Sequence, residues 1–299
     1  MIDFLFPYSY LVIWLGVLLG AGYSYFSIST YSIVILFFFI YLGIIKISPL
    51  LNILARSFRL FFPCEFSTLE TNIYESFKMT GNTNLEDGKY IFMWHPHAAY
   101  PVSLYFHTIS KFTNSPSFIK DSRAVTFASL LFLPFFSEMF ETLNLIPSDY
   151  HAIKRTLNTH SVSLTPGGMR EMLYEDTAIL LRRTGIFKIA LETGTPLVPI
   201  ISRGESKLCK AIQLPDWIQD FMGQFDSSLP IPTLKCFMKF IGILKNPLRD
   251  TIDSVIGEPI IVEQVKNPTD SQVEELRSKY IEILKAMYKK EIGRDLSVI

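Results

Sequence analysis

Two histidines at the end of an apolar run are the residues best suited to chemistry. His95 and His97 flank Pro96, directly after the predicted buried strand Tyr90–Trp94. A neutral imidazole can act as a general base for a hydroxyl, with its second nitrogen held by a carboxylate. Residues i and i+2 of a strand face the same side, although Pro96 favours a bend between the two rings. Either histidine alone would more often be a structural residue at a turn.

The same pair could instead bind a metal ion, because an H-x-H pattern occurs on strands of metal-dependent hydrolases. That alternative needs further ligands. The three other histidines, of five in the chain, show no ligand spacing. We therefore expect no metal site.

A glycine-rich turn is the second place suited to chemistry. Pro166-Gly167-Gly168 follows a short predicted strand and precedes a helix that begins at Met169. Backbone N–H groups at such a helix start can bind an anion. Glu171 lies in the first turn of this helix, where the helix dipole favours an acid whatever its function. The nearby cations, which could neutralise the phosphates of a nucleotide-like donor or form a solvated face, are Arg170, Arg182, Arg183 and Lys188.

Composition and missing motifs exclude several other classes of function. The chain has 299 residues, with 28 Lys and Arg against 28 Asp and Glu, so nucleic acid is a poor partner. Its three cysteines are far apart, which argues against a disulfide framework and a zinc site. P-loop, G-x-G-x-x-G and G-x-S-x-G motifs do not occur, which weakens the nucleotide-hydrolase, dinucleotide and serine-hydrolase alternatives.

Strands and helices that alternate along the chain must position these residues. This order predicts an α/β domain around a largely buried sheet. Strands are predicted at 90–94, 123–132, 161–165 and 196–201, and a strand–turn–strand unit at 251–262. Helices are predicted at 103–110, 148–157 with Ser148 as N-cap, and 185–192 with Gly194 as C-cap.

The last predicted helix has the clearest pattern. Thr269 and Gln272 form a capping box at its start. Its apolar face consists of Val273, Leu276, Tyr280, Leu284 and Met287.

The N-terminal segment is predicted to enter a membrane. Residues 1–45 carry one formal charge, Asp3, and residues 8–26 form an uncharged run long enough to span a bilayer. A second apolar run at 33–45 makes residues 1–47 either a transmembrane helical hairpin or a re-entrant wedge. The basic residues that follow, Lys46, Arg56 and Arg59, predict by the positive-inside rule that the domain of residues 48–299 is cytosolic.

Five segments in a fixed order resemble one known family. They are YIFMWHPHA, PGGMREML, RRTGIFKIALETGTPLVPI, RGE and VIGEPI. Together they resemble the type-2 diacylglycerol acyltransferase family, which includes monoacylglycerol and wax-alcohol acyltransferases, over roughly residues 50–295. The resemblance implies an acyltransferase-like mixed sheet flanked by helices. It also implies a membrane-bound enzyme that moves a fatty acyl group from acyl-CoA to a neutral lipid hydroxyl, with diacylglycerol giving triacylglycerol as the first expectation.

The resemblance carries roles onto individual residues. His97, with His95 in the same block, would be the general base, and Glu171 would orient or charge-stabilise the histidine. The residues that would bind substrate or CoA are Pro96, Gly167, Gly168, Arg170, Arg183, Lys188 and Glu205. The chain departs from the family pattern at Ala98, Ile186 and Arg203, where the family has Gly, Phe and Phe. These departures leave the reaction type intact and bear on the identity of the acceptor.

The resemblance also implies surroundings and partners. The expected place is the endoplasmic reticulum membrane with a cytosolic catalytic domain, and lipid droplets are a second location. Acyl-CoA is a co-substrate, and no cofactor is expected. The alternatives are another acceptor, namely monoacylglycerol, a long-chain alcohol or a lysophospholipid, and a non-catalytic membrane or lipid-droplet protein of the same fold. Homo-oligomerisation stays open.

Overall fold

The computed structural model describes most of the chain that follows residue 76. The described ranges are 77–96, 101–109, 115–127, 145–168, 178–179, 183–205, 211–212, 215, 217, 231–232 and 252–298. Contacts divide the chain into one unit of residues 1–64 and 127–143 and a second unit of residues 65–126 and 144–299. The predicted hairpin of residues 1–47 lies outside the described residues, so the hairpin and the boundary after residue 47 stay predictions. Within the described ranges, no helix combines the length and the apolar character needed to cross a bilayer.

A mixed seven-stranded sheet forms the centre of the second unit, in the order β1-β10-β7-β2-β5-β3-β4. Strands β7, β2, β5, β3 and β4 run parallel to one another, whereas β10 pairs antiparallel with β7 and parallel with β1. The bounds are β1 (Phe77–Gly81), β2 (Ile91–His95), β3 (Arg123–Thr126), β4 (Ile146–Pro147), β5 (Val162–Leu164), β7 (Leu197–Arg203) and β10 (Ile252–Ile256). Two smaller pairs join β11 (Ser297–Val298) to β6 (Ala178–Ile179) and β8 (Ala211–Ile212) to β9 (Ile231–Pro232).

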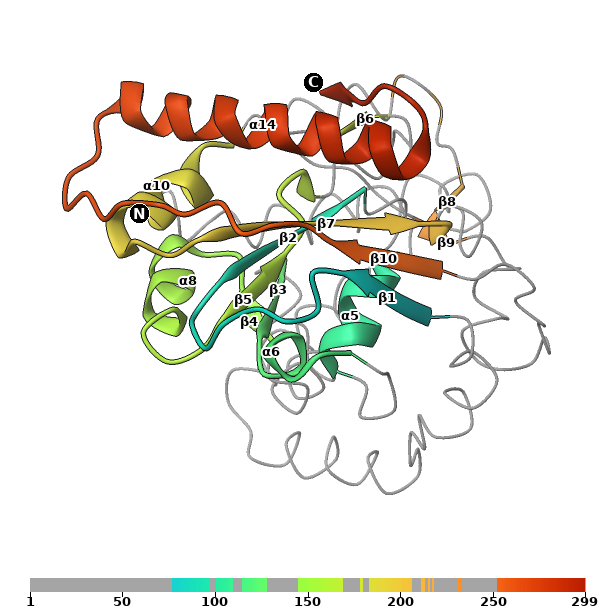
Figure 1. Ribbon diagram of the computed structural model, residues 1–299, viewed down its shortest axis with the longest axis horizontal. Helices are drawn as coiled ribbons and strands as arrows, with labels where there is room; N and C mark the ends of the chain where they lie inside the picture. The colour runs from blue at the N-terminus through green and yellow to red at the C-terminus, as the bar shows by residue number, and fades with distance from the viewer. Residues whose placement is uncertain are drawn as a thin grey trace, which may run out of the picture. The chain divides into compact units, whose positions relative to one another are not determined.

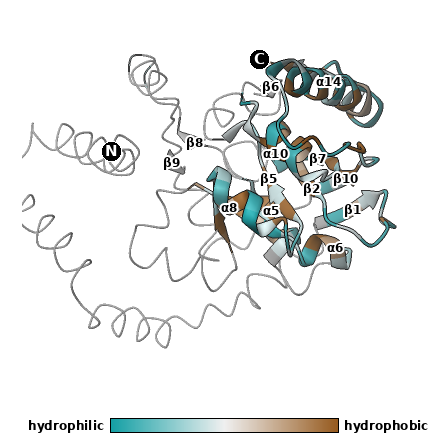
Figure 2. Ribbon diagram, turned by 90° about the vertical axis from the view of Figure 1, so that its left-hand side faces the viewer, coloured by the Kyte–Doolittle hydropathy of each residue, from teal (hydrophilic) through white to brown (hydrophobic). Residues whose placement is uncertain are grey.

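Helices cover both faces of this sheet (Figure 1). One face carries α5 (Val102–Ile109) and α6 (Ser117–Lys120). The other carries α8 (Tyr150–Thr156), α10 (Gly185–Thr193) and the long α14 (Asp270–Ile292). Figure 2 shows hydrophobic and hydrophilic residues interleaved along α14, as expected for a helix with one face on a core. The predicted α/β architecture, a mixed sheet flanked by helices, is therefore confirmed.

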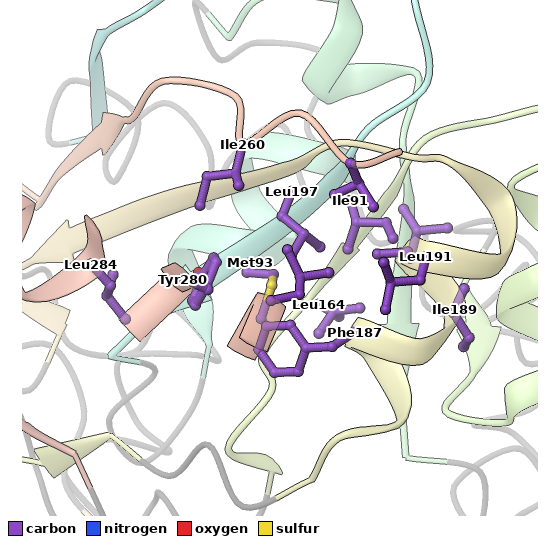
Figure 3. Packing of buried hydrophobic residues seen from close by; sticks show 14 of the residues in the cluster. Ile91, Met93, Leu164, Phe187, Ile189, Leu191, Leu197, Ile260, Tyr280 and Leu284 are labelled. Atoms are coloured by element: carbon purple, nitrogen blue, oxygen red, sulfur yellow. The ribbon is translucent and has the colours of Figure 1, made fainter. Parts of the chain in front are cut away.

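The central strand β2 faces two different cores. Ile91 and Met93 belong to a cluster with residues of α10 and α14, as Figure 3 shows with Phe187 and Tyr280. Phe92 and Trp94 point to the opposite face, because side chains alternate along a strand. There the Phe92 ring stacks on Phe118 of α6 with centroids 5.8 Å apart. All five residues of β2 are buried, which matches the uninterrupted apolar run.

Local sequence signals set most helix ends. The Thr269–Gln272 capping box is present at the start of α14. Gly194 ends α10 in the left-handed conformation at φ 65°, which glycine adopts without strain. The prediction of Ser148 as N-cap is wrong: the Asp149 carboxylate accepts the Ala152 N–H at 2.9 Å. The cause is that the Ser148 N–H extends the sheet by donating to the Thr126 carbonyl.

Two predicted strands are shorter than expected. β3 begins at Arg123 as predicted but ends at Thr126. The strand–turn–strand unit at 251–262 forms only its first strand, β10. Ile260 then makes a single antiparallel bridge to Leu197, at the start of β7. On the edge of β7 away from β2, residues Ile200–Arg203 already pair with β10, so Ile260 can bridge only near the start of β7.

Candidate functional site

The predicted site residues gather where the parallel strands end. His95 is the last residue of β2 and pairs in register with Ile201 of β7, so Gly204 and Glu205 follow at the same edge. Strand β5, on the other side of β2, ends at Leu164, just before Pro166-Gly167-Gly168. In α/β proteins this carboxyl edge of the sheet is the usual place for ligands and catalytic groups. The sequence therefore brings its three candidate segments to one edge.

His95 is fully buried and bonded to the last helix. Its Nε2 atom lies 2.8 Å from the hydroxyl oxygen of Tyr280 on α14, and both side chains are 0% exposed. The Tyr280 ring packs edge-on against Phe187 of α10, with centroids 5.6 Å apart. His95 thus lies on the same face of β2 as Ile91 and Met93, inside the core beneath α14.

Glu205 is also buried, with 3% of its surface exposed. Its Oε1 atom accepts the backbone N–H of Ser103, in the first turn of α5, at 2.6 Å. The first N–H groups of a helix have no partner within the helix, and the helix dipole favours a negative charge there. Pro96, between the two histidines, is buried as well. The Glu205 side chain therefore caps α5 from the end of a neighbouring strand.

Two of the residues predicted to bind CoA lie side by side. Gly168 has φ 58°, and a Cβ atom placed on it would lie 3.2 Å from Nη1 of Arg183. The Arg183 side chain is exposed, Gly168 is half-buried and Gly167 is buried. Lys188 lies on the exposed side of α10, where its charge contributes to lowering the pKa of Glu192 after the larger effects of hydrogen bonds from Lys154 and Tyr150. The structure thus joins the glycine turn to Arg183.

Three predicted site residues lie outside the described part of the chain: His97, Arg170 and Glu171. Their roles stay predictions. Over the described ranges, no group of three His, Cys, Asp or Glu side chains is arranged to hold a metal ion.

Arg203, one of the departures from the family pattern, has a structural place. Its guanidinium donates to the carboxylate of Asp253 on β10, and at 2.9 Å to the backbone carbonyl of Glu291 on α14. An arginine can reach both partners because its planar fork carries several donors. Arg203 therefore links the end of α14 to β7 and β10.

A second histidine is buried beneath β2, on the face opposite His95. His107 of α5 stacks on the Trp94 ring with centroids 5.7 Å apart, and its Nδ1 atom lies 2.7 Å from the Ser115 hydroxyl. Burial lowers the pKa of His107 to about 4, with a smaller contribution from the positive charge of Lys120. The imidazole is therefore neutral at physiological pH and belongs to the core that supports α5.

This buried histidine makes the fold sensitive to acid. In the unfolded chain the imidazole takes up a proton below its ordinary pKa of 6.5, whereas the folded protein does so only near pH 4. Stability is therefore lost as the pH falls through this window, by about 2 kcal/mol between pH 7 and 5.

We expect the His107→Gln variant to be less stable than the parent protein at pH 7, but to lose about 2 kcal/mol less of its free energy of unfolding on acidification to pH 5. Denaturant unfolding in detergent micelles at both pH values measures this, with exposed His151→Gln as the control. Equal pH dependence of His107→Gln and the parent protein would contradict the expectation.

An open polar groove lies at the opposite, amino-terminal edge of the sheet. Its lining includes Lys89, His151, Lys154 and Glu192, and none of the predicted site residues. Glu192 accepts hydrogen bonds there from Tyr150 and from Lys154, the latter at 2.5 Å. These paired charges fasten α8 to α10.

Sequence reasoning missed two contacts at the candidate site. Tyr280 was expected only as a member of an apolar helix face, and the N–H of Ser103 was not singled out. A hydroxyl within an otherwise apolar stripe is the one signal that could have indicated Tyr280, because a buried phenol needs a hydrogen-bond partner. Nothing local indicates the pairing of Ser103 with Glu205.

Comparison with known proteins gives a consistent family. The sequence profile described as "Diacylglycerol acyltransferase" matches residues 43–294. A mouse protein named 2-acylglycerol O-acyltransferase 1 is 30% identical over 224 residues, which are 69% of this chain and 66% of the relative. A Dictyostelium discoideum protein named Diacylglycerol O-acyltransferase 2 is 26% identical over 80% of this chain and 73% of its own length.

The chain therefore spans just under two thirds of the mouse relative. Among solved structures, a 1-acyl-sn-glycerophosphate acyltransferase, PlsC, from Thermotoga maritima aligns with a TM-score of 0.47 and 16% identity. That alignment covers 77% of this chain and 80% of the bacterial one.

Proposed function

Because the chain belongs to the diacylglycerol acyltransferase family, we propose that it transfers a fatty acyl group from acyl-CoA to the hydroxyl of a neutral lipid. The observation that carries this proposal is the family match over residues 43–294, which includes every candidate site residue. Diacylglycerol is the proposed acceptor and triacylglycerol the product. The convergence of three candidate segments at the carboxyl edge of the sheet supports it.

In the proposed mechanism His97 is the general base. It removes the proton from the acceptor hydroxyl while the hydroxyl oxygen attacks the thioester carbonyl. Backbone N–H groups stabilise the oxyanion that forms on the carbonyl oxygen. The C–S bond then breaks, and the CoA sulfur leaves with the proton that His97 had taken up. Glu171 orients the histidine, and no covalent acyl-enzyme is formed.

We assign His95 a different part in this reaction. Its ring is 0% exposed and its Nε2 atom is engaged with Tyr280, so it is remote from a substrate that arrives from solvent or membrane. His95 therefore supports the end of β2, two residues before His97. Arg183 beside Gly168, with Arg170 and Lys188, is proposed to bind the phosphates of CoA.

The site of action is proposed to be the endoplasmic reticulum membrane, with lipid droplets as a second location. Residues 1–47 would anchor the chain, and the catalytic domain would face the cytosol. A neutral lipid acceptor is dissolved in the bilayer, so an enzyme acting on it must bind at the membrane surface. The uncharged run of residues 8–26 supports this placement.

Monoacylglycerol is the second candidate acceptor, because a relative 30% identical to the chain is named a 2-acylglycerol acyltransferase. The deciding experiment supplies labelled acyl-CoA to microsomes from a host strain that lacks neutral-lipid synthesis. Each assay adds one acceptor: diacylglycerol, monoacylglycerol, a long-chain alcohol or a lysophospholipid. We expect the label to enter triacylglycerol at the highest rate. Microsomes without the protein give the background rate.

The outcomes of this assay separate the alternatives. Labelled diacylglycerol without triacylglycerol would make the protein a monoacylglycerol acyltransferase. Label only in the lysophospholipid product would overturn the neutral-lipid proposal. If purified protein releases no free CoA thiol with any acceptor, the chain is a non-catalytic member of the family.

A further inference from the structure

We propose that Tyr280 and Glu205 are positioning residues, which hold the two described elements, β2 and α5, between which His97 lies in the sequence. β2 ends at His95 and α5 begins at Val102. The inference rests on the proposed role of His97 as general base. It changes the predicted role of Glu205 from substrate binding to support of the start of α5.

The end of β2 is held by the hydroxyl of Tyr280. The oxygen lies 2.8 Å from Nε2 of His95, and neither side chain has surface open to water. A hydrogen bond in such an environment is electrostatically stronger than one in water, and losing a partner leaves a buried polar atom unsatisfied. Phe187 fixes the plane of the Tyr280 ring through an edge-on contact. The bond therefore sets where the last residue of β2 lies.

The start of α5 is held by the side chain of Glu205. It accepts the Ser103 N–H at 2.6 Å, and both residues are buried, Glu205 at 3% and Ser103 at 0% exposure. Losing the acceptor would leave the buried Ser103 N–H without a partner at the helix start, which costs free energy. Because Ser103 is in the first turn of α5, this bond fixes both the position and the start of the helix.

The two holding groups come from distant parts of the fold. Tyr280 belongs to α14, 185 residues away from His95, and Glu205 follows β7, 102 residues away from Ser103. Neither side chain is placed to meet a substrate, since both are buried and bonded to protein atoms. Their shared property is contact with a described residue on one side of His97 in the sequence, at the end of β2 or at the start of α5. A general base needs such support, because a displacement of about 1 Å can cost about 10²-fold in rate.

The test compares kcat and KM in the full-length protein in microsomes. We expect Tyr280→Phe and Glu205→Ala each to lower kcat about 10- to 100-fold, with the KM for acyl-CoA within about twofold of the parent protein. Glu205→Gln should recover part of the loss, because its amide oxygen still accepts the Ser103 N–H. The kcat of the Tyr280→Phe/Glu205→Ala double variant should be only slightly below that of the less active single variant, because both side chains support the same base.

Two matched controls separate positioning from general loss of stability. Tyr288→Phe removes another buried tyrosine hydroxyl from α14, and Glu192→Gln neutralises a bonded carboxylate at the opposite edge of the sheet. Both should keep the kcat of the parent protein. Hydrogen exchange of the peptide covering residues 96–103 adds a readout independent of activity. It should speed up in Tyr280→Phe and Glu205→Ala and stay unchanged in the controls.

Several results would overturn the inference. A parent-like kcat in Tyr280→Phe, or unchanged exchange over residues 96–103 in both variants, would remove the positioning role. A raised KM for acyl-CoA with kcat unchanged in Glu205→Gln would return Glu205 to substrate contact. A parent protein inactive with every acceptor, or an active His97→Ala variant, would instead refute the proposed function.

Discussion

Replacing His97 by alanine is expected to lower kcat for acyl transfer about 10³-fold, within the range that general bases contribute. The physical reason is the acceptor: an alkyl hydroxyl is a weak nucleophile until a base takes its proton. β2 ends two residues before His97 at the carboxyl edge of the sheet, and α5 begins five residues after it. Labelled acyl-CoA and diacylglycerol, supplied to microsomes with matched amounts of each variant, measure the rate.

The expected pattern is a loss in kcat with little change in the KM for acyl-CoA, since alanine at this position removes proton transfer and leaves the phosphate-binding residues intact. His151→Ala, an exposed histidine at the opposite edge, is the control and should keep the activity of the parent protein. An activity of His97→Ala within about threefold of the parent protein would remove the general base from the mechanism.

Replacing Gly257 by alanine is expected to lower the free energy of unfolding by about 2 kcal/mol. A Cβ atom at this position would lie 2.8 Å from Sδ of Met287 on α14, 2.9 Å from Cγ of Pro199 and 3.1 Å from the Pro199 carbonyl oxygen. The sulfur can move, but Pro199 is part of β7 and its carbonyl accepts the Gly257 N–H at 2.8 Å. The added methyl group therefore forces the backbone at position 257 away from Pro199 of β7, and the Met287 side chain must move as well, which disturbs the contact of α14 with the sheet.

The same change should reduce activity, because α14 carries the Tyr280 hydroxyl that contacts His95. Thermal unfolding in detergent micelles and the acyl-transfer rate measure the two effects. Gly185→Ala, where a new methyl group meets no atom within 4 Å, is the control and should be at least as stable as the parent protein. Equal stability of Gly257→Ala and the parent protein would show that α14 does not need this close approach.

Local signals in the sequence predicted most of the described elements. The capping box at Thr269 and the glycine at 194 act within one helical turn, and β2 is an apolar run that needs no knowledge of its neighbours. The predictions that were wrong depend on partners elsewhere in the chain. Ser148 is not the N-cap because its N–H continues the sheet by pairing with Thr126. Residues 258–262 form no strand because β10 already pairs with Ile200–Arg203 on that edge of β7.

For the candidate site, the sequence predicted which segments meet but not what each residue contacts. The ends of β2, β5 and β7, which are followed by or contain His95, Gly168 and Glu205, gather at one edge, as the alternating pattern indicates. The burial of Glu205 against α5 could not be foreseen, because an acid after a strand looks the same whether it faces substrate or a helix start. From the sequence, Arg203 is likewise only a departure from the family pattern. Its bonds to Asp253 and to the Glu291 carbonyl depend on strands and a helix that meet only in the folded protein.

The place of Tyr280 also bears on when the protein becomes active during its synthesis. A ribosome adding about 5–20 residues each second needs roughly 10–40 s to travel the 185 residues from His95 to Tyr280. Throughout that interval the N-terminal apolar segment has already left the ribosome, while His95 still lacks the Tyr280 hydroxyl. For the proposed membrane-bound acyltransferase, a nascent chain would thus reach the membrane before it could consume acyl-CoA.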